Sequence, residues 1–318
     1  MAIFLVTGGA GFIGSHLTDA LLQAGHRVRV LDDLSTGRRA NLDPRCEFIL
    51  GDVADAMAVR RAAQGTAGVF HLAAIASVAR SNEEWCGTHR VNAAGTVAVL
   101  DAARAVGRVP VVYASSAAIY GDQGAGAINE TARPAPMTAY GADKLASELH
   151  AAIGFGIHAV PSIGFRFFNV YGPRQDPASP YSGVISIFAA RIAAGLPVAL
   201  HGDGRQTRDF VYVLDVVRHL VAAMALLRAA PQAAVLNLCT GHGTAIRALA
   251  QVIGETTGGA PALQPGPARP GDIRASVGDP ARPAPAAAPA RLPSSRRSPA
   301  PARGSRCHGR CIGSAPRP

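Results

Sequence analysis

Residues 3–14 read IFLVTGGAGFIG, an apolar run followed by glycines at every third position. The run Ile3–Thr7 is typical of a buried strand, and Ser15–Ala24 has the amphipathic spacing of a helix, with residues 8–14 as the loop between them. Glycines in such a loop allow a tight turn, and the first N–H groups of the helix can bind a pyrophosphate. An ordinary turn is the alternative, but this context favours a dinucleotide-binding loop. The residues expected to contact the dinucleotide are Gly8, Gly11, Phe12, Ile13 and Gly14.

Strands and helices are predicted to alternate through the first half of the chain. Further strands are expected at 27–31, 69–72, 111–114 and 162–168, and further helices at about 91–105 and 140–153. This order predicts an α/β fold with a doubly wound parallel sheet of the Rossmann type. We therefore expect residues 1–169 to form a dinucleotide-binding domain, to which the C-terminal half contributes later strands. Residues 170–279 are expected to form a smaller α/β substrate lobe.

Carboxylates follow the second and third predicted strands, where a dinucleotide would place its adenosine half. Asp32 ends the second strand, and a carboxylate there accepts hydrogen bonds from ribose hydroxyls and repels a 2′-phosphate. The cofactor is therefore expected to be NAD rather than NADP. The alternative for Asp32 is an acid in a solvated loop. For the neighbouring Asp33, this alternative and a contact with the cofactor are about equally well supported. A third strand is expected just before Gly51, and Asp52 and Val53 after it are expected near the cofactor, as are Leu72, Ala73 and Ala74 at the end of the fourth strand, 69–72.

A tyrosine and a lysine are spaced for one face of the predicted helix 140–153. Tyr140 and Lys144 lie four residues apart, so their side chains are one turn from each other. An ammonium beside a phenol, together with a nicotinamide cation, would lower the tyrosine pKa and make Tyr140 a general base near neutral pH. Tyr-x-x-x-Lys also arises by chance, but Lys144 is the only lysine among 31 basic residues, which favours a role that arginine cannot fill. Ser115 and Ser116 end a strand at the carboxyl edge of the sheet, where a hydroxyl can bridge the tyrosine and a substrate.

The composition argues against several other classes of protein. No apolar run approaches the roughly 20 residues that cross a bilayer, and no basic lead precedes the first apolar run as in a signal peptide. The five cysteines are scattered and odd in number, which fits a reducing cytoplasm better than a disulfide framework. Residues 280–318 hold eight of the arginines and no acid, so most of the net charge of +10 lies there rather than on a nucleic-acid-binding surface. We expect a cytoplasmic enzyme with no nucleic acid, membrane or metal partner.

Several motifs occur in the order typical of one enzyme family. They are Thr7–Gly14, His71–Ala74, Ser115–Gly121, Tyr140 with Lys144, and Phe165–Pro173. On these residues the chain resembles the extended short-chain dehydrogenase/reductase family over about residues 2–279, and within it the UDP-glucose 4-epimerase-like members. The resemblance implies a tightly bound NAD and a UDP-hexose that is oxidised at C4 and reduced again on its other face. It also implies a homodimer that packs two long helices of each subunit, here 91–105 and 140–153.

The resemblance also implies roles for individual residues. Tyr140 matches the catalytic base, and Lys144 matches the residue that holds the nicotinamide ribose. Ser116 matches the serine that hydrogen-bonds the reacting sugar oxygen, with Ser115 as the alternative. Further matched residues are Asn92 and Phe167 near the cofactor, and Asn169, Arg208 and Arg269 at the substrate diphosphate, where a surface ion pair is the alternative for each arginine. Ser276 matches a position where a small residue admits N-acetylated hexoses and a tyrosine excludes them.

The two residues after Ser116 separate epimerisation from related reactions. Family members that dehydrate or decarboxylate the 4-keto sugar carry an acidic residue here, whereas this chain has Ala117 and Ala118. Without an acid to eliminate water, the keto sugar is expected to be reduced again. A dehydratase, decarboxylase or reductase that acts on another nucleotide sugar is the alternative activity.

Residues 280–318 depart from the family pattern. They hold nine Pro, nine Ala and eight Arg with no hydrophobic periodicity, which predicts a disordered tail. Family members continue here with a helix, a strand and a final helix, so our hypothesis is that a frameshift replaced them. A leucine-containing amphipathic helix in another reading frame of the gene would support it. If the tail is genuine, the alternative is an NAD-binding protein without turnover.

Overall fold

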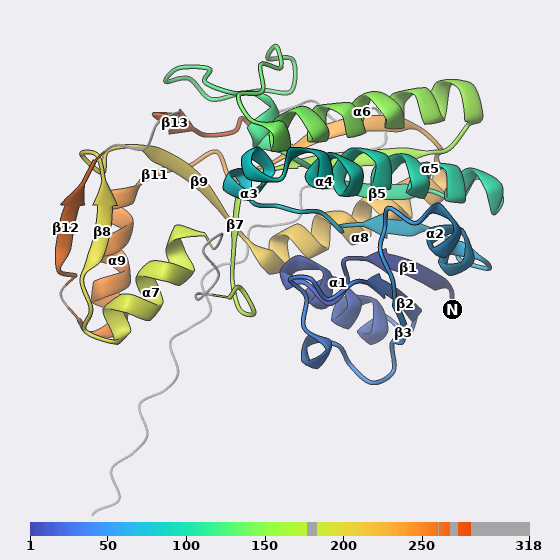
Figure 1. Cartoon of the computed structure of the whole chain (residues 1–318), viewed down its shortest axis with the longest axis horizontal. Coiled ribbons are helices and arrows are strands. Elements are labelled where there is room, and N and C mark those ends of the chain that lie inside the picture. Colours follow the sequence, from blue (N-terminus) through green and yellow to red (C-terminus); the bar gives the residue numbers. More distant parts are fainter. Residues whose placement is uncertain (177–182, 260, 268–272, 281–318) are drawn as a thin grey trace, which may run out of the picture.

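The computed structural model describes residues 1–176, 183–259, 261–267 and 273–280, and a seven-stranded sheet forms its centre (Figure 1). In sheet order the strands are β10 (Ala233–Leu238), β6 (Ser162–Phe167), β5 (Val111–Ser116), β4 (Val69–His71), β1 (Ile3–Thr7), β2 (Arg27–Asp32) and β3 (Glu47–Leu50). Every neighbouring pair is parallel. The order reverses between β1 and β4, which creates a topological switch point at their carboxyl ends. The Rossmann-type fold predicted from the sequence is confirmed.

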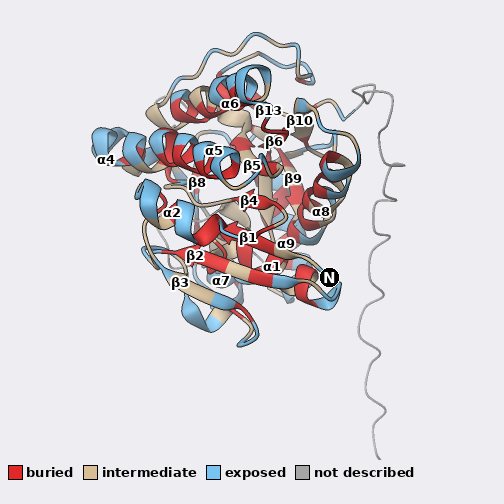
Figure 2. Cartoon of the chain, turned by 90° about the vertical axis from the view of Figure 1, so that its right-hand side faces the viewer, coloured by how far each residue is buried: buried red, intermediate tan, exposed pale blue. Residues whose placement is uncertain are grey.

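Helices cover both faces of this sheet. Figure 1 shows α5 (Gly95–Ala105) and α6 (Ala139–His158) on one face, and α1 (Phe12–Gln23) and α8 (Val213–Ala229) on the other, while α2 (Ala56–Ala63) packs against α5. Along β1, Phe4 and Val6 pack into the core beneath α1 and α8, whereas Leu5 packs into the core beneath α2 and α5. Alternate side chains of a strand point to opposite faces, so one strand serves both cores. Figure 2 shows the buried residues concentrated between these layers.

A smaller lobe lies beside the carboxyl edge of the large sheet (Figure 1). Its strands are β7 (Asn169–Tyr171), β9 (Thr207–Tyr212), β11 (Gly243–Ala245) and β13 (Ala275–Ser276) in one sheet, and β8 (Val198–His201) with β12 (Leu263–Gly266) in another. Its helices α7 (Val184–Ala193) and α9 (Ile246–Thr257) pack on each other around Phe188, Ile192 and Leu249. Between the lobe's segments the chain returns to the large sheet through α8 and β10.

The loop predicted at residues 8–14 is shorter in the structure, because α1 begins at Phe12. Gly14 therefore lies in the first turn of the helix rather than before it. Its missing side chain lets this turn pack directly on the backbone of Gly8. The prediction that the helix begins at Ser15 was wrong, since all three glycines were read as loop residues.

The helix predicted at 91–105 is the second part of a longer helical segment. The longer segment follows α3 (Val78–Glu83). It starts with α4 (Trp85–His89), passes through a π-helical turn at Arg90–Ala94, and continues as α5. Short 3₁₀ turns occur at Arg39–Asn41 and Ala117–Ile119. A π-turn holds one extra residue, which breaks the helical periodicity on which the prediction depended.

Helix α6 continues five residues past its predicted end at Ile153 and stops at His158. Gly154 and Gly156 are typical of helix ends, yet the helix runs through both of them. It ends at Ala159, a non-glycine residue with φ of +54°. The glycines were therefore misleading, and the true end carries no sequence signal.

Candidate active site

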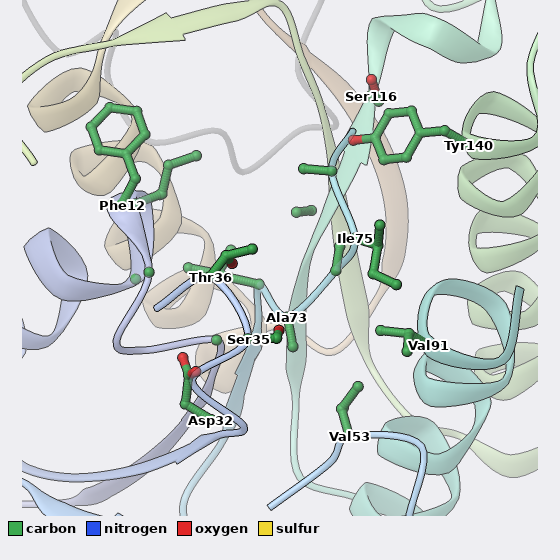
Figure 3. A pocket seen from close by; sticks show the side chains of 18 of the residues that line it. Phe12, Asp32, Ser35, Thr36, Val53, Ala73, Ile75, Val91, Ser116 and Tyr140 are labelled. Atoms are coloured by element: carbon green, nitrogen blue, oxygen red, sulfur yellow. The ribbon is translucent and has the colours of Figure 1, made fainter. Parts of the chain in front are cut away.

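A cavity of about 650 Å³ lies at the switch point, where the segments after β1, β2, β3, β4 and β5 meet (Figure 3). The predicted residues that line it are Gly8, Gly11, Phe12, Ile13, Gly14, Asp32, Asp52, Val53, Leu72, Ala73, Ala74, Ser115, Ser116, Tyr140, Lys144, Phe167 and Asn169. The carboxyl ends of parallel strands bring these segments together from distant parts of the chain. Open α/β sheets bind their ligands at this position.

The turn from β1 into α1 has room only for glycine at two positions. Gly8 has φ of +71°, and a Cβ atom there would lie 2.6 Å from the backbone nitrogen of Ala73. A Cβ on Gly14 would lie 2.1 Å from the carbonyl oxygen of Gly8. The first turn of α1 follows directly, and its N–H groups have no partner within the helix. This glycine cradle fits the pyrophosphate of a dinucleotide.

The two acids after β2 are both tied to the local backbone. Asp32 accepts hydrogen bonds from Ala10 N and Leu34 N, each at 2.9 Å. Burial raises the pKa of Asp32, and these two hydrogen bonds oppose the shift. Asp33 is exposed and accepts from both the backbone nitrogen and the hydroxyl of Ser35. The carboxylate of Asp32 is therefore held in a fixed orientation at the edge of the cavity (Figure 3).

The segments after β3 and β4 are supported from the π-turn at Arg90–Ala94. Asp52 accepts from Ala54 N at 2.8 Å and pairs with Arg90 at 2.7 Å. Asn92 is buried, at 1% exposed, and is not among the described residues that line the cavity. Its amide accepts from Ile75 N at 2.8 Å and donates to Ile75 O at 3.1 Å. Asn92 therefore fixes the segment after β4, and it is Ile75 that lines the cavity (Figure 3).

Three polar side chains meet where β5 ends beside α6. Thr138 caps α6 by accepting from Gly141 N at 3.1 Å, which places Tyr140 in the first turn. The hydroxyl of Tyr140 points to Ser116 and shares a hydrogen bond with it (Figure 3). Lys144 Nζ lies 5.8 Å from the centre of the Tyr140 ring and donates to Ala114 O at 2.9 Å. The phenol, the ammonium and a serine hydroxyl thus lie together at the cavity wall.

The protein groups alone do not lower the pKa of Tyr140. Burial raises this pKa, and the hydrogen bond with Ser116 opposes the shift. Burial also lowers the pKa of Lys144 from 10.5 to about 8, while the nearby Asp143 raises it. Desolvation disfavours the charged forms of both side chains. A low tyrosine pKa would therefore need the positive charge of an oxidised nicotinamide in addition to Lys144.

The two candidate serines have different surroundings. Ser115 is 1% exposed, and its hydroxyl donates to Glu148 Oε1 at 2.5 Å. Ser116 is partly buried and accepts from Ala118 N at 3.1 Å, which leaves its hydroxyl directed to Tyr140. Of the two, Ser116 has the geometry to bridge the tyrosine and a ligand.

Of the residues that the family resemblance assigns to the substrate, only some lie at the cavity. Asn169, at the start of β7, lines it. Arg208 and Ser276 are paired neighbours on β9 and β13, but neither is among the described residues that line the cavity. Nη1 of Arg208 donates to the carbonyls of Thr207 and Ile273. Arg269 lies outside the described residues, as does the segment 281–318.

Several lining residues were missed by the sequence analysis. They include Ser35, Thr36, Ile75, Arg80 and Val91. Ser35 and Thr36 lie two and three residues after Asp33, so their position after the second strand could have indicated them. Arg80 lies on α3, a helix of 6 residues that is too short to show amphipathic periodicity.

Among the described residues, no group of three or more His, Cys, Asp or Glu side chains is arranged to hold a metal ion. None of the described helices is long and apolar enough to cross a membrane. The described cysteines, Cys46, Cys86 and Cys239, are all free.

The chain is similar to known enzymes over most of its length. Residues 4–239 match the NAD dependent epimerase/dehydratase family. A UDP-glucose 4-epimerase from Mycolicibacterium smegmatis is 39% identical over 279 residues, which are 86% of this chain and 88% of the relative. The solved structure of a Thermus thermophilus UDP-glucose 4-epimerase in complex with NAD is 40% identical, with a TM-score of 0.80 over 87% of this chain and 90% of that one. A UDP-N-acetylglucosamine 4-epimerase from Methanobrevibacter ruminantium, in complex with UDP-N-acetylmuramic acid, is 31% identical, with a TM-score of 0.83 over 88% and 90%.

The fold and the site define a Rossmann-type enzyme of the short-chain dehydrogenase/reductase type, with a glycine cradle for a dinucleotide and a serine, a tyrosine and a lysine beside it. The chain belongs to the NAD dependent epimerase/dehydratase family. NAD is therefore its cofactor. The glycines at positions 8 and 14, where a Cβ would collide with backbone, fit this group.

Proposed function

We propose that the protein is an isomerase that inverts C4 of a UDP-hexose. UDP-glucose and UDP-galactose are the first candidate pair, and their N-acetylated counterparts are the second. The meeting of Ser116, Tyr140 and Lys144 beside the glycine cradle carries the proposal. Together these side chains would supply one base and one hydroxyl to a sugar alcohol that lies against the nicotinamide.

In this reaction one proton moves between the sugar and a side chain of the protein. Tyr140 Oη accepts the proton of the C4 hydroxyl, and Ser116 Oγ holds the same oxygen in line. Lys144 is anchored on Ala114 O at 2.9 Å, which fixes its ammonium beside the phenol. The chemistry that NAD supplies when bound is reversible hydride transfer at C4. Returning the proton from Tyr140 after the sugar has turned over restores the starting state of the enzyme.

The surroundings of Ser116 favour epimerisation over elimination. Ala117 and Ala118 form the 3₁₀ turn that follows it, so no acid is adjacent to the serine. The described carboxylates that line the cavity are Asp32, Asp33, Asp52 and Glu84. The first three follow β2 and β3 on the adenosine side, and Glu84 is paired with Arg80 at 3.0 Å. None of them is placed to remove a proton next to the C4 carbonyl beside Ser116.

Further residues are proposed for the UDP and the hexose. Asn169 would contact the diphosphate from the cavity wall, and Arg208 and Arg269 would approach it from the lobe as guanidinium forks. Ser276 lies beside Arg208 in the paired strands, so a small side chain here would leave space for an N-acetyl group. A Ser276→Tyr variant is expected to lose activity on UDP-N-acetylglucosamine and keep it on UDP-glucose. Equal loss on both sugars, measured in one competition assay, would contradict this role.

Proton NMR tests the activity directly. The purified protein is incubated with UDP-glucose and UDP-N-acetylglucosamine together, without added cofactor. Appearance of either galacto-epimer supports C4 epimerisation with retained NAD, and Tyr140→Phe provides the inactive control. A 4-keto-6-deoxy product or a pentose product would indicate a dehydratase or a decarboxylase instead. An unchanged spectrum would contradict the proposal and favour an NAD-binding protein without turnover.

We also propose that two chains associate through α4 to α6. Exposed apolar side chains gather on these helices: Trp85, Val97, Leu149, Ile153 and Ile157. The last three recur every four residues and share one face of α6. An apolar stripe of this kind is typical of a protein–protein interface.

The free cysteines of the described residues fit a reducing compartment, so the cytoplasm is the proposed location.

A further inference from the structure

Helix α6 contacts the end of β5 at three successive turns. Tyr140 shares a hydrogen bond with Ser116, and four residues later Lys144 donates to Ala114 O at 2.9 Å. Four residues later again, Glu148 Oε1 accepts from the hydroxyl of Ser115 at 2.5 Å. Residues four apart lie on the same face of a helix. The third contact therefore extends the catalytic pair by one turn, behind the cavity wall.

Glu148 is itself fixed by a buried arginine on the next strand. Arg166 of β6 donates from Nε to Oε1 at 2.9 Å and from Nη2 to Oε2 at 2.7 Å. The two side chains are 8% and 6% exposed. A forked pair of this kind fixes both the distance and the orientation of the carboxylate. Ser115 and Arg166 are also direct partners in the paired strands, so one carboxylate joins β5, β6 and α6.

The remaining donor of Arg166 reaches the segment between β5 and α6. Nη1 donates to Tyr120 Oη at 2.8 Å and to Glu130 O at 3.1 Å. Tyr120 in turn donates to Asn237 Oδ1 at 2.6 Å. Every polar group of this buried network has a partner, which makes its geometry rigid. Neither Glu148 nor Arg166 is among the described residues that line the cavity.

We propose that Glu148 and Arg166 are positioning residues for the reaction, and that Ser115 acts through them rather than by binding the sugar. This inference rests on the proposed C4 epimerisation. The carboxylate holds the end of β5 against α6, which sets the position of Ser116 relative to Tyr140. Loss of the Ser115 hydroxyl releases that end of β5, and displacement of a catalytic group by an ångström is costly to the rate. A buried ion pair that served only the fold would leave catalysis per folded molecule unchanged.

A double-mutant cycle separates the two roles. Ser115→Ala is expected to lower kcat about tenfold and leave KM within about twofold of the wild-type value. Glu148→Gln removes the charge that Arg166 holds and is expected to lower kcat at least as much. The double variant should match Glu148→Gln alone, because both changes break the same contact. Additive losses, or a change confined to KM, would show that Ser115 binds the substrate by itself and would overturn the proposal.

Two controls keep the result interpretable. Ser162→Ala removes another 1%-exposed serine, at the amino end of β6, and is expected to leave kcat and KM unchanged. Equal losses in Ser162→Ala and Ser115→Ala would refute a specific role. If thermal unfolding shows that Glu148→Gln does not fold, Glu148→Asp takes its place, since it keeps the charge and withdraws the carboxylate by one methylene.

One readout does not depend on turnover. The Tyr140 phenol can be titrated by the ultraviolet difference between each protein and the same protein with Tyr140→Phe. Ser115→Ala should raise the Tyr140 pKa, because it loosens the hydrogen bond from Ser116. An unchanged tyrosine titration would overturn the positioning role even if neither UDP-sugar is converted. Failure of the wild-type protein to convert either sugar, with a shifted titration, would refute only the proposed function.

Discussion

Tyr140 is the residue on which the proposed chemistry depends most directly. It is the group at the cavity wall that can accept a proton in line with Ser116. General base catalysis contributes roughly a hundred- to ten-thousandfold to a rate. We therefore expect Tyr140→Phe to lower kcat about a thousandfold while NAD stays bound. NMR turnover and the absorbance of the released cofactor measure the two effects, and wild-type turnover by the variant would refute the assignment.

Lys144 makes the stability depend on pH in a direction that can be stated. Burial lowers its pKa from 10.5 to about 8, so between these values the folded chain binds fewer protons than the unfolded chain. The free energy of unfolding then rises with pH across this window, and below about 8 the penalty of the buried ammonium is constant. Lys144→Met removes this titration and the activity. The Tm of the wild type minus that of the variant should be flat below pH 8 and rise above it.

Calorimetry of both proteins over the same pH series tests this. The subtraction removes the contribution of other groups, such as the buried tyrosines and cysteines whose pKa values are raised. Two Tm curves that stay parallel above pH 8 would mean that Lys144 keeps an ordinary pKa in the folded protein.

The sequence predicted those site residues that stand out by their spacing or by being the only residue of their type. Tyr140 and Lys144 lie four residues apart, and Lys144 is the only lysine in the chain. The partner of Ser115 could not be predicted in the same way, because Glu148 and Arg166 meet it only after α6 packs across two strands. Asn92 was expected near the cofactor, but its contact with Ile75 depends on the π-turn.

Among the elements, the turn from β1 into α1 is the least tolerant of change. A Cβ at Gly14 would lie 2.1 Å from the carbonyl oxygen of Gly8. We expect Gly14→Ala to destabilise the fold by about 1–3 kcal/mol through overpacking and to abolish NAD binding, because the first turn of α1 must move away. Fluorescence-monitored urea unfolding and NAD titration measure both losses.

Gly156→Ala is the matched control for this prediction. Gly156 lies in α6, and nothing is within 4 Å of the position that its Cβ would take. The same substitution there should stabilise the helix by up to about 1 kcal/mol, as alanine does in an exposed helix interior. A Gly14→Ala variant that binds NAD as tightly as Gly156→Ala would show that the glycine cradle is not the pyrophosphate site.

The types of most predicted elements were correct, and their ends were often wrong for physical reasons. Helix α6 passes through two glycines because its buried face, which includes Lys144, Glu148 and Ala151, packs against the sheet and α5. Tertiary packing thus overrides a local stop signal of about 1 kcal/mol per glycine.

For the whole molecule, the class of fold was predictable but its spatial order was not. Alternation of strands and helices in the first half predicts a parallel sheet. Strand β10 pairs with β6 although the first part of the small lobe and α8 lie between them in the chain, and no local pattern marks this pairing. The mixed segment after residue 170 could be recognised as a lobe, whereas its pairing of β9 with β7, β11 and β13 appears only in the structure.

The apolar stripe on α6 predicts that two chains associate. Ile153 on α6 is 49% exposed and lies between Leu149 and Ile157 on the apolar stripe. Ile153→Asp would bury a carboxylate in the proposed interface without a partner, so the protein should sediment as a monomer. Leu196→Asp is the matched control, because Leu196 is also 49% exposed but lies beside α7 in the small lobe.

Sedimentation velocity of the three proteins at equal concentration separates the outcomes. A dimer for the wild type and Leu196→Asp, with a monomer for Ile153→Asp, places the interface on α6. If all three sediment alike, the stripe is not the interface. Because Leu149, Ile153 and Ile157 lie on the same helix as Tyr140, the monomer should also keep less activity than the control. The stripe and the catalytic face share one rigid element, so loss of the partner would loosen the helix that holds the base.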